Sequence, residues 1–174
     1  MRTINTCNGK IKIFGVLAVF LFLTGVVSGY GIEGGGICNC NSCGDCTNAL
    51  NDNTNCANKV KLTANIWDYA GYCINNPANF NNKIFDCQGH TIDGDGSGTG
   101  HGIYLNNKDD DTIKNCVITD FCFGIFLQYS SDNTLTSNTV NSNTHHGICL
   151  QSSSNYNIIT SNTMNYNTQN GIFL

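Results

Sequence analysis

The sequence predicts an all-β fold, a parallel β-helix (solenoid) with a short helical, Cys-rich cap at its N-terminal end. Three observations lead there: a motif that recurs every 22 to 24 residues in the second half, a composition with 28 Asn and 19 Gly but only 11% charged residues, and eleven cysteines in 174 residues. Few Lys and Glu disfavour a helical bundle, because Asn competes with the helical backbone for hydrogen bonds. The 40% hydrophobic content at regular positions favours a packed core over disorder.

Residues 1–29 are expected to be a signal peptide or an uncleaved signal anchor. Three basic residues precede residue 13, and residues 13–32 carry no charge. Val27-Ser28-Gly29 supplies small residues at which a signal peptidase could cut. Either form exports the remaining chain, so we expect a secreted or cell-surface protein. Membrane contact is expected only through this segment, if it is not cleaved.

The charge of the remaining chain excludes one class of partner. After residue 29, five lysines face twelve acidic residues, which gives a net charge near −7, and no Arg is left. A surface that binds nucleic-acid phosphates needs clustered cations. A nucleic-acid-binding function is therefore excluded.

The segment before the repeats is predicted to be a linker followed by a cap. Residues 30–45 are expected to be a Cys-rich linker, and residues 46–82 the N-terminal cap and first strand. Asp45 suits the N-cap of a short helix that runs to Leu50, and residues 60–66 alternate as a strand does. Solenoids need such lids to close their hydrophobic ends.

A dense cysteine cluster allows two interpretations. Cys38, Cys40, Cys43 and Cys46 lie within nine residues, and four thiolates could bind a metal ion. Their spacing matches no zinc or iron–sulfur signature, so disulfides are the favoured interpretation in an exported chain.

The disulfide partners are hypotheses, because connectivity does not follow from sequence. Cys46 with Cys56 would join the cap helix to the turn after it, and Cys73 with Cys87 would join the loop to the first coil. Cys87 and Cys116 occupy one column of neighbouring coils. They are expected to stack as thiols, because adjacent strands lie about 4.8 Å apart whereas bridged Cβ atoms need about 3.8 Å.

Residues 83–174 are expected to form the β-helix repeats. Alternation in the motif Gly-Ile-x-Leu places Ile and Leu inward and the middle residue outward. Asn115, Asn138 and Asn162 each precede the next such Gly by nine residues and are expected to stack as an Asn ladder. The chain stops at the inward Leu174, which favours a truncated C-terminal end. The four copies of the motif are Gly102–Leu105, Gly124–Leu127, Gly147–Leu150 and Gly171–Leu174.

These motifs carry a family resemblance. Gly-Ile-x-Leu, the Ser-Ser-Asx turn after it and the following Asn-Thr, together with Phe85–Gly94, resemble the right-handed parallel β-helix repeat proteins. That group includes the NosD-like periplasmic copper-binding proteins and the carbohydrate-binding and sugar-hydrolysis domain, relatives of pectin lyases in fold. The resemblance covers residues 83–174 and implies a right-handed β-helix. It implies little about function, since many unrelated activities share this scaffold.

The chemistry that the resemblance implies finds little support in the residues. His101 and His146 share a column, but Phe123 lies between them, and two strand steps make about 9.6 Å, too far for one copper ion. Resemblance to the lyase relatives implies a mechanism based on Arg, but no Arg follows residue 29. Nothing selects a glycosidase pair among the acidic residues of the coils, which are Asp93, Asp95, Asp109 and Asp120.

The most suggestive functional feature is an outward column of Tyr104, Phe126, Cys149 and Phe173. Stacked aromatic side chains either stabilise the sheet or form a platform for sugar rings. We therefore expect an exported, noncatalytic module that is structural or binds a cell-envelope polysaccharide through Tyr104, Phe126 and Phe173, without a cofactor. The alternatives are a polysaccharide hydrolase whose site lies partly beyond Leu174, and a periplasmic protein that binds metal through its cysteine cluster.

Overall fold

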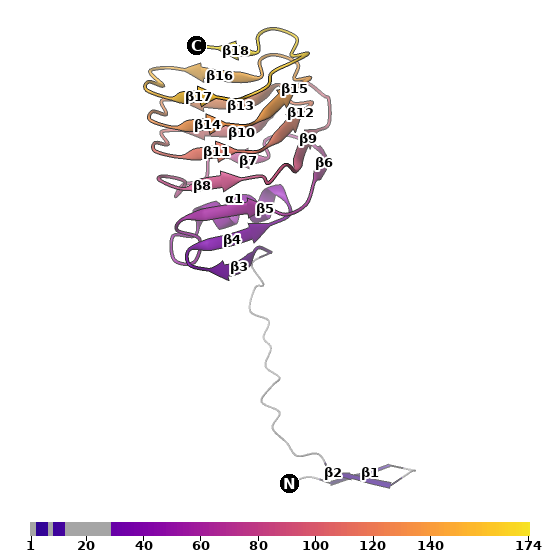
Figure 1. Ribbon diagram of the computed structural model, residues 1–174. Helices are drawn as coiled ribbons and strands as arrows, with labels where there is room; N and C mark the ends of the chain where they lie inside the picture. The colour runs from indigo at the N-terminus through magenta and orange to yellow at the C-terminus, as the bar shows by residue number, and fades with distance from the viewer. Residues whose placement is uncertain (1–2, 7–8, 13–28) are drawn as a thin grey trace.

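The computed structural model describes residues 3–6, 9–12 and 29–174, and from residue 31 on it shows a β-solenoid of about six turns (Figure 1). The coils are stacked so that successive strands of the chain fall into three sheets. Within these sheets every pairing is parallel except that of the first two strands, β3 and β4. The predicted right-handed parallel β-helix with a helical, Cys-rich cap is confirmed.

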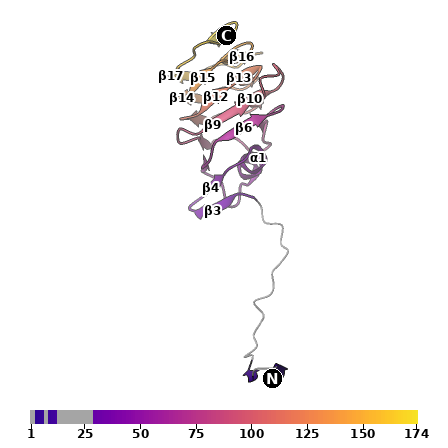
Figure 2. The same ribbon diagram turned by 90° about the vertical axis from the view of Figure 1, so that its right-hand side faces the viewer.

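Each sheet forms one side of the solenoid, and Figure 2 shows the strands of the smallest one stacked above each other. The five-stranded sheet holds β7 (Ile74–Asn75), β10 (His101–Asn106), β13 (Phe123–Gln128), β16 (Ile148–Gln151) and β18 (Ile172–Phe173). The four-stranded sheet holds β6 (Ile66–Tyr69), β9 (Thr91–Gly94), β12 (Val117–Thr119) and β15 (Thr139–Asn141). The seven-stranded sheet holds β3 (Gly31–Gly34), β4 (Ile37–Cys40), β5 (Lys59–Leu62), β8 (Ile84–Asp86), β11 (Thr112–Lys114), β14 (Thr134–Thr136) and β17 (Ile158–Thr160).

Residues 1–2, 7–8 and 13–28 of the segment predicted to be a signal lie outside the described residues. Two short strands within it, β1 (Thr3–Thr6) and β2 (Gly9–Lys12), pair antiparallel. Its role as signal peptide or anchor stays a prediction. Across the described ranges, none of the helical segments has the length and apolar character needed to cross a membrane.

The cap begins earlier than the sequence suggested. Residues 30–45 are not a linker, because they contain β3, β4 and the first turn of α1 (Cys43–Asn51). The N-cap of α1 is Ser42, whose Oγ accepts a hydrogen bond from Asp45 N, so Asp45 lies in the first turn instead of capping it. The helix packs against β4, β5 and β7 and buries Ala49 and Leu50.

Four disulfides link eight of the ten cysteines in residues 29–174, and both predicted pairs are wrong. Alternation in β4 directs Cys38 and Cys40 inward, toward the buried side of α1. The linker interpretation missed this strand and therefore its two inward thiols. Because every cysteine of the cluster is bridged, the thiolate metal site is wrong as well. The bonds are Cys38–Cys56, Cys40–Cys46, Cys43–Cys73 and Cys87–Cys116.

The bond between Cys87 and Cys116 also corrects the expectation of stacked thiols. The register pairs Asp86 with Lys114 and Thr91 with Val117, so four residues face two at this corner. The spacing of in-register strands does not apply at such a corner. The two Cα atoms lie 4.7 Å apart, within the range that a disulfide spans.

The glycine of the repeated motif is required by packing inside the solenoid. A Cβ atom at Gly102 would overlap Ile118, and one at Gly124 would overlap Val140, both of which belong to the next segment of the four-stranded sheet. Ile103, Leu105, Ile125 and Leu127 fill the interior beside them and are fully buried. The glycine of the motif therefore marks the position at which the five-stranded and four-stranded sheets pack too closely for a side chain.

An Asn ladder exists, but its first member differs from the prediction. Asn138 Oδ1 accepts from Cys116 N, and Asn162 Oδ1 accepts from Asn138 N, each at 3.0 Å or less. Asn115 instead lies opposite Ser137, because Lys114 pairs with Thr136. Asn115 and Ser137 both have φ near 55°, a left-handed conformation that Asn tolerates better than most residues. The prediction aligned the coils by their distance from the glycine. The coil that contains Asn138 has one more residue after β15 than the coil before it, so this distance aligned Asn138 with Asn115 instead of Cys116.

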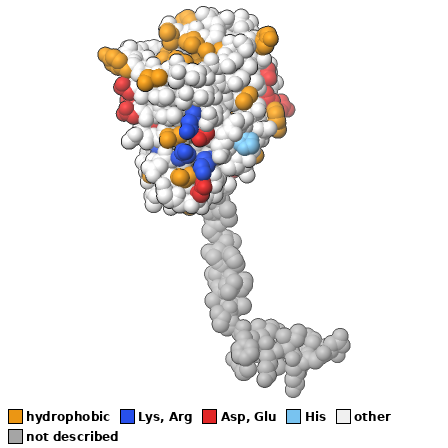
Figure 3. Space-filling view, viewed as in Figure 1, with side chains coloured by type: hydrophobic (Ala, Val, Ile, Leu, Met, Phe, Trp, Pro, Cys, Tyr) orange, Lys and Arg blue, Asp and Glu red, His pale blue; other side chains and the backbone are white. Residues whose placement is uncertain are grey.

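The outside of the seven-stranded sheet carries Lys59 and Lys61 of β5 and Lys114 of β11, and Figure 3 shows basic and acidic side chains together on this side. Lys61 Nζ lies 2.7 Å from Glu33 Oε2, and Lys114 Nζ lies 3.4 Å from Asp86 Oδ2. The charges on this side are largely compensated.

Candidate functional site

An aromatic face covers the outside of the five-stranded sheet. The register aligns Tyr104 with Phe126, Phe126 with Cys149, and Cys149 with Phe173, which is the column that the sequence predicted. A second column aligns His101 with Phe123, three residues earlier in the same two strands. We use the term aromatic face for the rings that contact one another here: Tyr72, His101, Tyr104, Phe123, Phe126, His145, His146 and Phe173.

The rings of this face form one continuous chain of contacts. Tyr104 and Phe126 stack with centroids 5.5 Å apart and planes 27° apart, and Phe123 stacks on Phe126 at 5.2 Å. His146 stacks on Phe173 at 4.8 Å with planes 11° apart. Aromatic pairs in such geometries add about 0.5–1.5 kcal/mol each to the burial of their area. The rings are held in place before any ligand arrives.

Burial changes the chemistry of individual members of the face. His101 is only 8% exposed, and burial lowers its pKa, so it is a neutral ring near pH 7. Burial lowers the pKa of His146 as well. Cys149, expected to be exposed in the column, is fully buried, and burial raises the pKa of its thiol to about 11. The exposed part of the column therefore consists of rings alone.

A column of amides runs beside the aromatic column. The register aligns Asn106 with Gln128 and Gln128 with Gln151, one residue beyond the inward Leu of each motif. Gln128 Oε1 accepts a hydrogen bond from the Tyr104 hydroxyl at 3.1 Å. No Lys, Arg, Asp or Glu lies in the described strands of this sheet. The face combines apolar rings with neutral hydrogen-bonding groups.

A thiol and an imidazole meet at the rim of this face. Cys122 Sγ lies 3.3 Å from His145 Nδ1, and both side chains are half-buried. The backbone fixes the pair, because His145 N donates to Cys122 O at 2.9 Å and Cys122 N donates to Gly100 O at 3.1 Å. The sequence reasoning missed it, although the separation of 23 residues equals one coil of the repeat. That equality would have been the signal.

Of the acidic residues considered for hydrolysis, two form a hydrogen-bonded pair and two lie apart. Asp120 hydrogen-bonds to Asp93, and burial followed by the charge of Asp93 raises the pKa of Asp120. Asp93 also accepts from the Thr119 hydroxyl at 2.6 Å. Asp95 contacts Ser97 and Asp109 contacts Ser131, in separate turns. Two carboxyl groups in direct hydrogen bond are closer than the separation of about 5–9.5 Å that glycosidases use.

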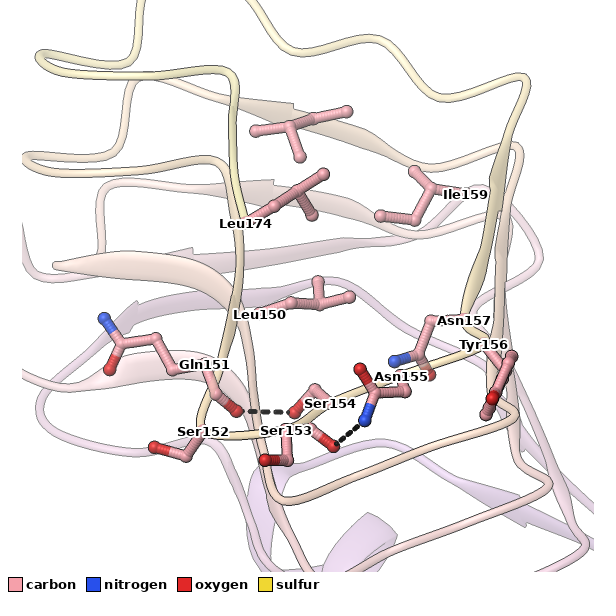
Figure 4. Close-up of a pocket in the computed structure, with 11 residues that line it drawn as sticks. Leu150, Gln151, Ser152, Ser153, Ser154, Asn155, Tyr156, Asn157, Ile159 and Leu174 are labelled. Atoms are coloured by element: carbon pink, nitrogen blue, oxygen red, sulfur yellow. Dashed lines mark hydrogen bonds between the residues drawn. The ribbon is translucent and has the colours of Figure 1, made fainter.

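A pocket with a volume of about 590 Å³ lies at the last coil (Figure 4). Leu150, Ile159 and Leu174 line it on one side, and the turn of residues 152–157 lines the other. Two hydrogen bonds within that turn, from Ser154 Oγ and Asn155 Nδ2 to backbone carbonyls, hold its shape. Leu150 and Ile159 continue the inward columns of the coils, so this pocket is the interior of the solenoid open at its last coil.

The sequence matches one family model across most of this β-helix. The model, described as periplasmic copper-binding protein (NosD), matches residues 58–174, from the first parallel coil to the last. The chain belongs to the NosD family. No curated protein and no solved structure matches it. Membership in the NosD family, together with four disulfides, supports an extracytoplasmic β-helix module.

The description of the NosD family names copper, so the side chains of this chain can be tested as copper ligands. Across residues 29–174 there is no group of three His, Cys, Asp or Glu side chains that converge. The four-ligand or three-ligand sets typical of zinc and cupric ions are thus not found in that range. The two described cysteines outside disulfides are Cys122 and Cys149, and only Cys122 contacts an imidazole.

Proposed function

We propose that this NosD-family module binds a neutral polysaccharide of the cell envelope along its aromatic face. The observation that carries the proposal is the stacked column of Tyr104 and Phe126 beside the amide column of Gln128 and Gln151. Sugar rings present apolar C–H faces to aromatic side chains and hydroxyl groups to amides. This combination of side chains suits them better than it suits a peptide or a phosphate.

The spacing of the coils supports an extended chain as the ligand. Neighbouring strands lie about 4.8 Å apart, close to the length of one pyranose residue in an extended polysaccharide. Successive rings on the face could therefore contact successive sugars. The neutral character follows from charge, because the described strands of this sheet carry no ionised side chain and a net charge near −7 after residue 29 repels acidic glycans.

Glycan binding is tested by array and calorimetry with the full chain. Phe126→Ala is expected to weaken binding to a neutral glycan about tenfold or more, equivalent to about 1.4 kcal/mol. The matched control is Trp67→Ala, which removes an aromatic ring that is 64% exposed on another side of the solenoid. Equal binding by wild type and Phe126→Ala, or loss in Trp67→Ala alone, would overturn the proposal.

A second candidate function comes from the family description. We infer that the module binds a copper ion outside the cytoplasm, and the contact between Cys122 and His145 favours this function. Thiolate and imidazole are both copper ligands, and thiolate favours the cuprous state. Uptake of copper by the purified chain, measured by elemental analysis after removal of excess metal, tests this function as a whole.

A further inference from the structure

Cys122 and His145 place a thiol beside an imidazole in a region where most cysteines are bridged. Eight of the ten cysteines in residues 29–174 form disulfides, and the ninth, Cys149, is buried beneath the aromatic face. Cys122 stays half-exposed, with its Sγ 3.3 Å from a ring nitrogen of His145. It is therefore the described thiol that a solvent-borne metal ion can reach.

The backbone holds the pair at a fixed corner of two successive coils. His145 N donates to Cys122 O, and Gln169 N of the following coil donates to His145 O, both at 2.9 Å. The His145 ring also lies against Phe123, with centroids 5.5 Å apart. The two donor atoms are thus oriented toward each other by ladder hydrogen bonds and ring contacts, without a ligand.

The surroundings of the pair select the class of ion. Thr144 lies beside the pair, with a hydroxyl that donates to Phe121 O at 3.4 Å and contacts the thiol, whose pKa burial raises. The closest carboxyl group along the chain, Asp120, is hydrogen-bonded to Asp93. Hard divalent ions require several oxygen ligands, whereas a soft monovalent ion accepts a small set of sulfur and nitrogen donors.

We propose that Cys122 Sγ and His145 Nδ1 are the ligands of a cuprous ion. This site rests on the second candidate function and specifies its residues and its oxidation state. On binding, Cu(I) replaces the proton of the Cys122 thiol, which leaves to solvent, and takes the lone pair of the unprotonated Nδ1 of His145. No electron is transferred.

The experiment is a competition titration of the full chain with Cu(I), kept reduced by ascorbate and buffered by a colorimetric cuprous chelator. Ascorbate leaves the four disulfides intact. We expect one Cu(I) per chain and an X-ray absorption spectrum with one sulfur and at least one imidazole nitrogen neighbour. Cys122→Ser and His145→Phe are each expected to lower the affinity at least tenfold, while Cys122→Met, which keeps a soft sulfur, retains part of it.

Two thiol controls isolate the site. Cys149→Ser removes the buried thiol, and Cys7→Ser removes the remaining cysteine of the chain; both are expected to bind Cu(I) as wild type does. Unfolding curves of each variant show whether the fold persists. If wild type takes up no Cu(I), the site and the copper function both fail. If wild type binds but Cys122→Ser and His145→Phe bind equally well, the copper function stands and this site is wrong.

Discussion

The cap and the repeated coils are stabilised in different ways. Three of the four disulfides lie between residues 38 and 73, where the strands are uneven and a helix interrupts them, and the fourth closes the first corner of the coils. From residue 117 on, the described coils contain no disulfide, and Asn side chains satisfy the backbone at each corner. A ladder needs an equivalent residue in the next coil, which the irregular cap does not provide.

Removing a cap disulfide is expected to have the largest effect and to spare the coils. The bond between Cys43 and Cys73 closes a loop of 30 residues, so the double change Cys43→Ser, Cys73→Ser should lower the free energy of unfolding by about 3–4 kcal/mol. Hydrogen exchange should increase in α1 and β7 and stay unchanged in β14 and β15. Equal loss of protection in both regions would mean that cap and coils unfold as one unit.

Breaking the ladder is expected to affect the coils instead. Asn138→Ala leaves Cys116 N without an acceptor and Ile113 O without its side-chain donor, both in the buried interior. Leaving buried polar groups unsatisfied costs about 1–3 kcal/mol. Urea unfolding measures the loss, and the exposed Asn165→Ala, within about 0.5 kcal/mol of wild type, is the control. A similar change in both variants would show that the ladder contributes nothing specific.

The repeated half of the fold was predictable because repetition supplies its own check. The four Gly-Ile-x-Leu copies gave the strands of one sheet and the correct outward column. Period alone could not find the insertion that shifts Asn115 from the ladder, since it lies in a turn. The cap has no period, so β4 and its inward Cys38 and Cys40 were missed, and with them the two disulfides that these cysteines form.

The candidate sites differ in the same way. The aromatic column followed from alternation in the strands, but alternation did not predict the full burial of Cys149 between Phe126 and Phe173 in that column. The contact of Cys122 with His145 depends on a corner, where coils differ in length by a residue. Repeats in the sequence therefore predict side chains aligned along the strands, but they do not predict contacts between side chains at the corners.

Asp111 is the point where the ladder of the coils reaches the cap. Its Oδ1 accepts from Lys83 N, as Asn133 Oδ1 accepts from Asp111 N in the next coil. Asn133 uses its amide N–H to donate to Lys108 O, but an aspartate has no such donor, and Asp111 Oδ2 is the one buried side-chain oxygen or nitrogen in the described residues without a partner. Burial raises the pKa of Asp111 to about 7.

The stability of the chain should therefore depend on the charge of Asp111. A carboxyl group with a raised pKa binds its proton more tightly in the folded state than in the unfolded state, where the pKa is about 3.9. The contribution of Asp111 to the free energy of unfolding is fully present below about pH 4 and is lost as the pH rises toward 7. Asp111→Asn should raise the free energy of unfolding at pH 8 by about 1–2 kcal/mol and flatten this dependence. Unfolding at pH 5 and pH 8 measures both; the same pH slope in the variant would assign the dependence elsewhere.

The surface ion pairs should give the smallest effect, and the coil pair should exceed the cap pair. Asp86 is 12% exposed at its side chain, whereas Glu33 in the cap is 45% exposed and its pair with Lys61 is screened by water. Burial tends to raise the pKa of Asp86, but hydrogen bonds from Asn115 and Gln88 and the charge of Lys114 lower it below its usual range. Its stabilisation is therefore present above about pH 4 and is lost as the pH falls.

Lys114→Ala should cost about 0.5–1 kcal/mol at pH 7 and low salt, and less at 1 M salt. Lys61→Ala is the matched change in the cap and should have a smaller effect at either salt concentration. Thermal unfolding of both variants at two salt concentrations makes the comparison. A larger loss for Lys61→Ala would mean that the cap depends on its surface charges as well as on its disulfides. The division between a covalently stabilised cap and hydrogen-bonded coils would then need revision.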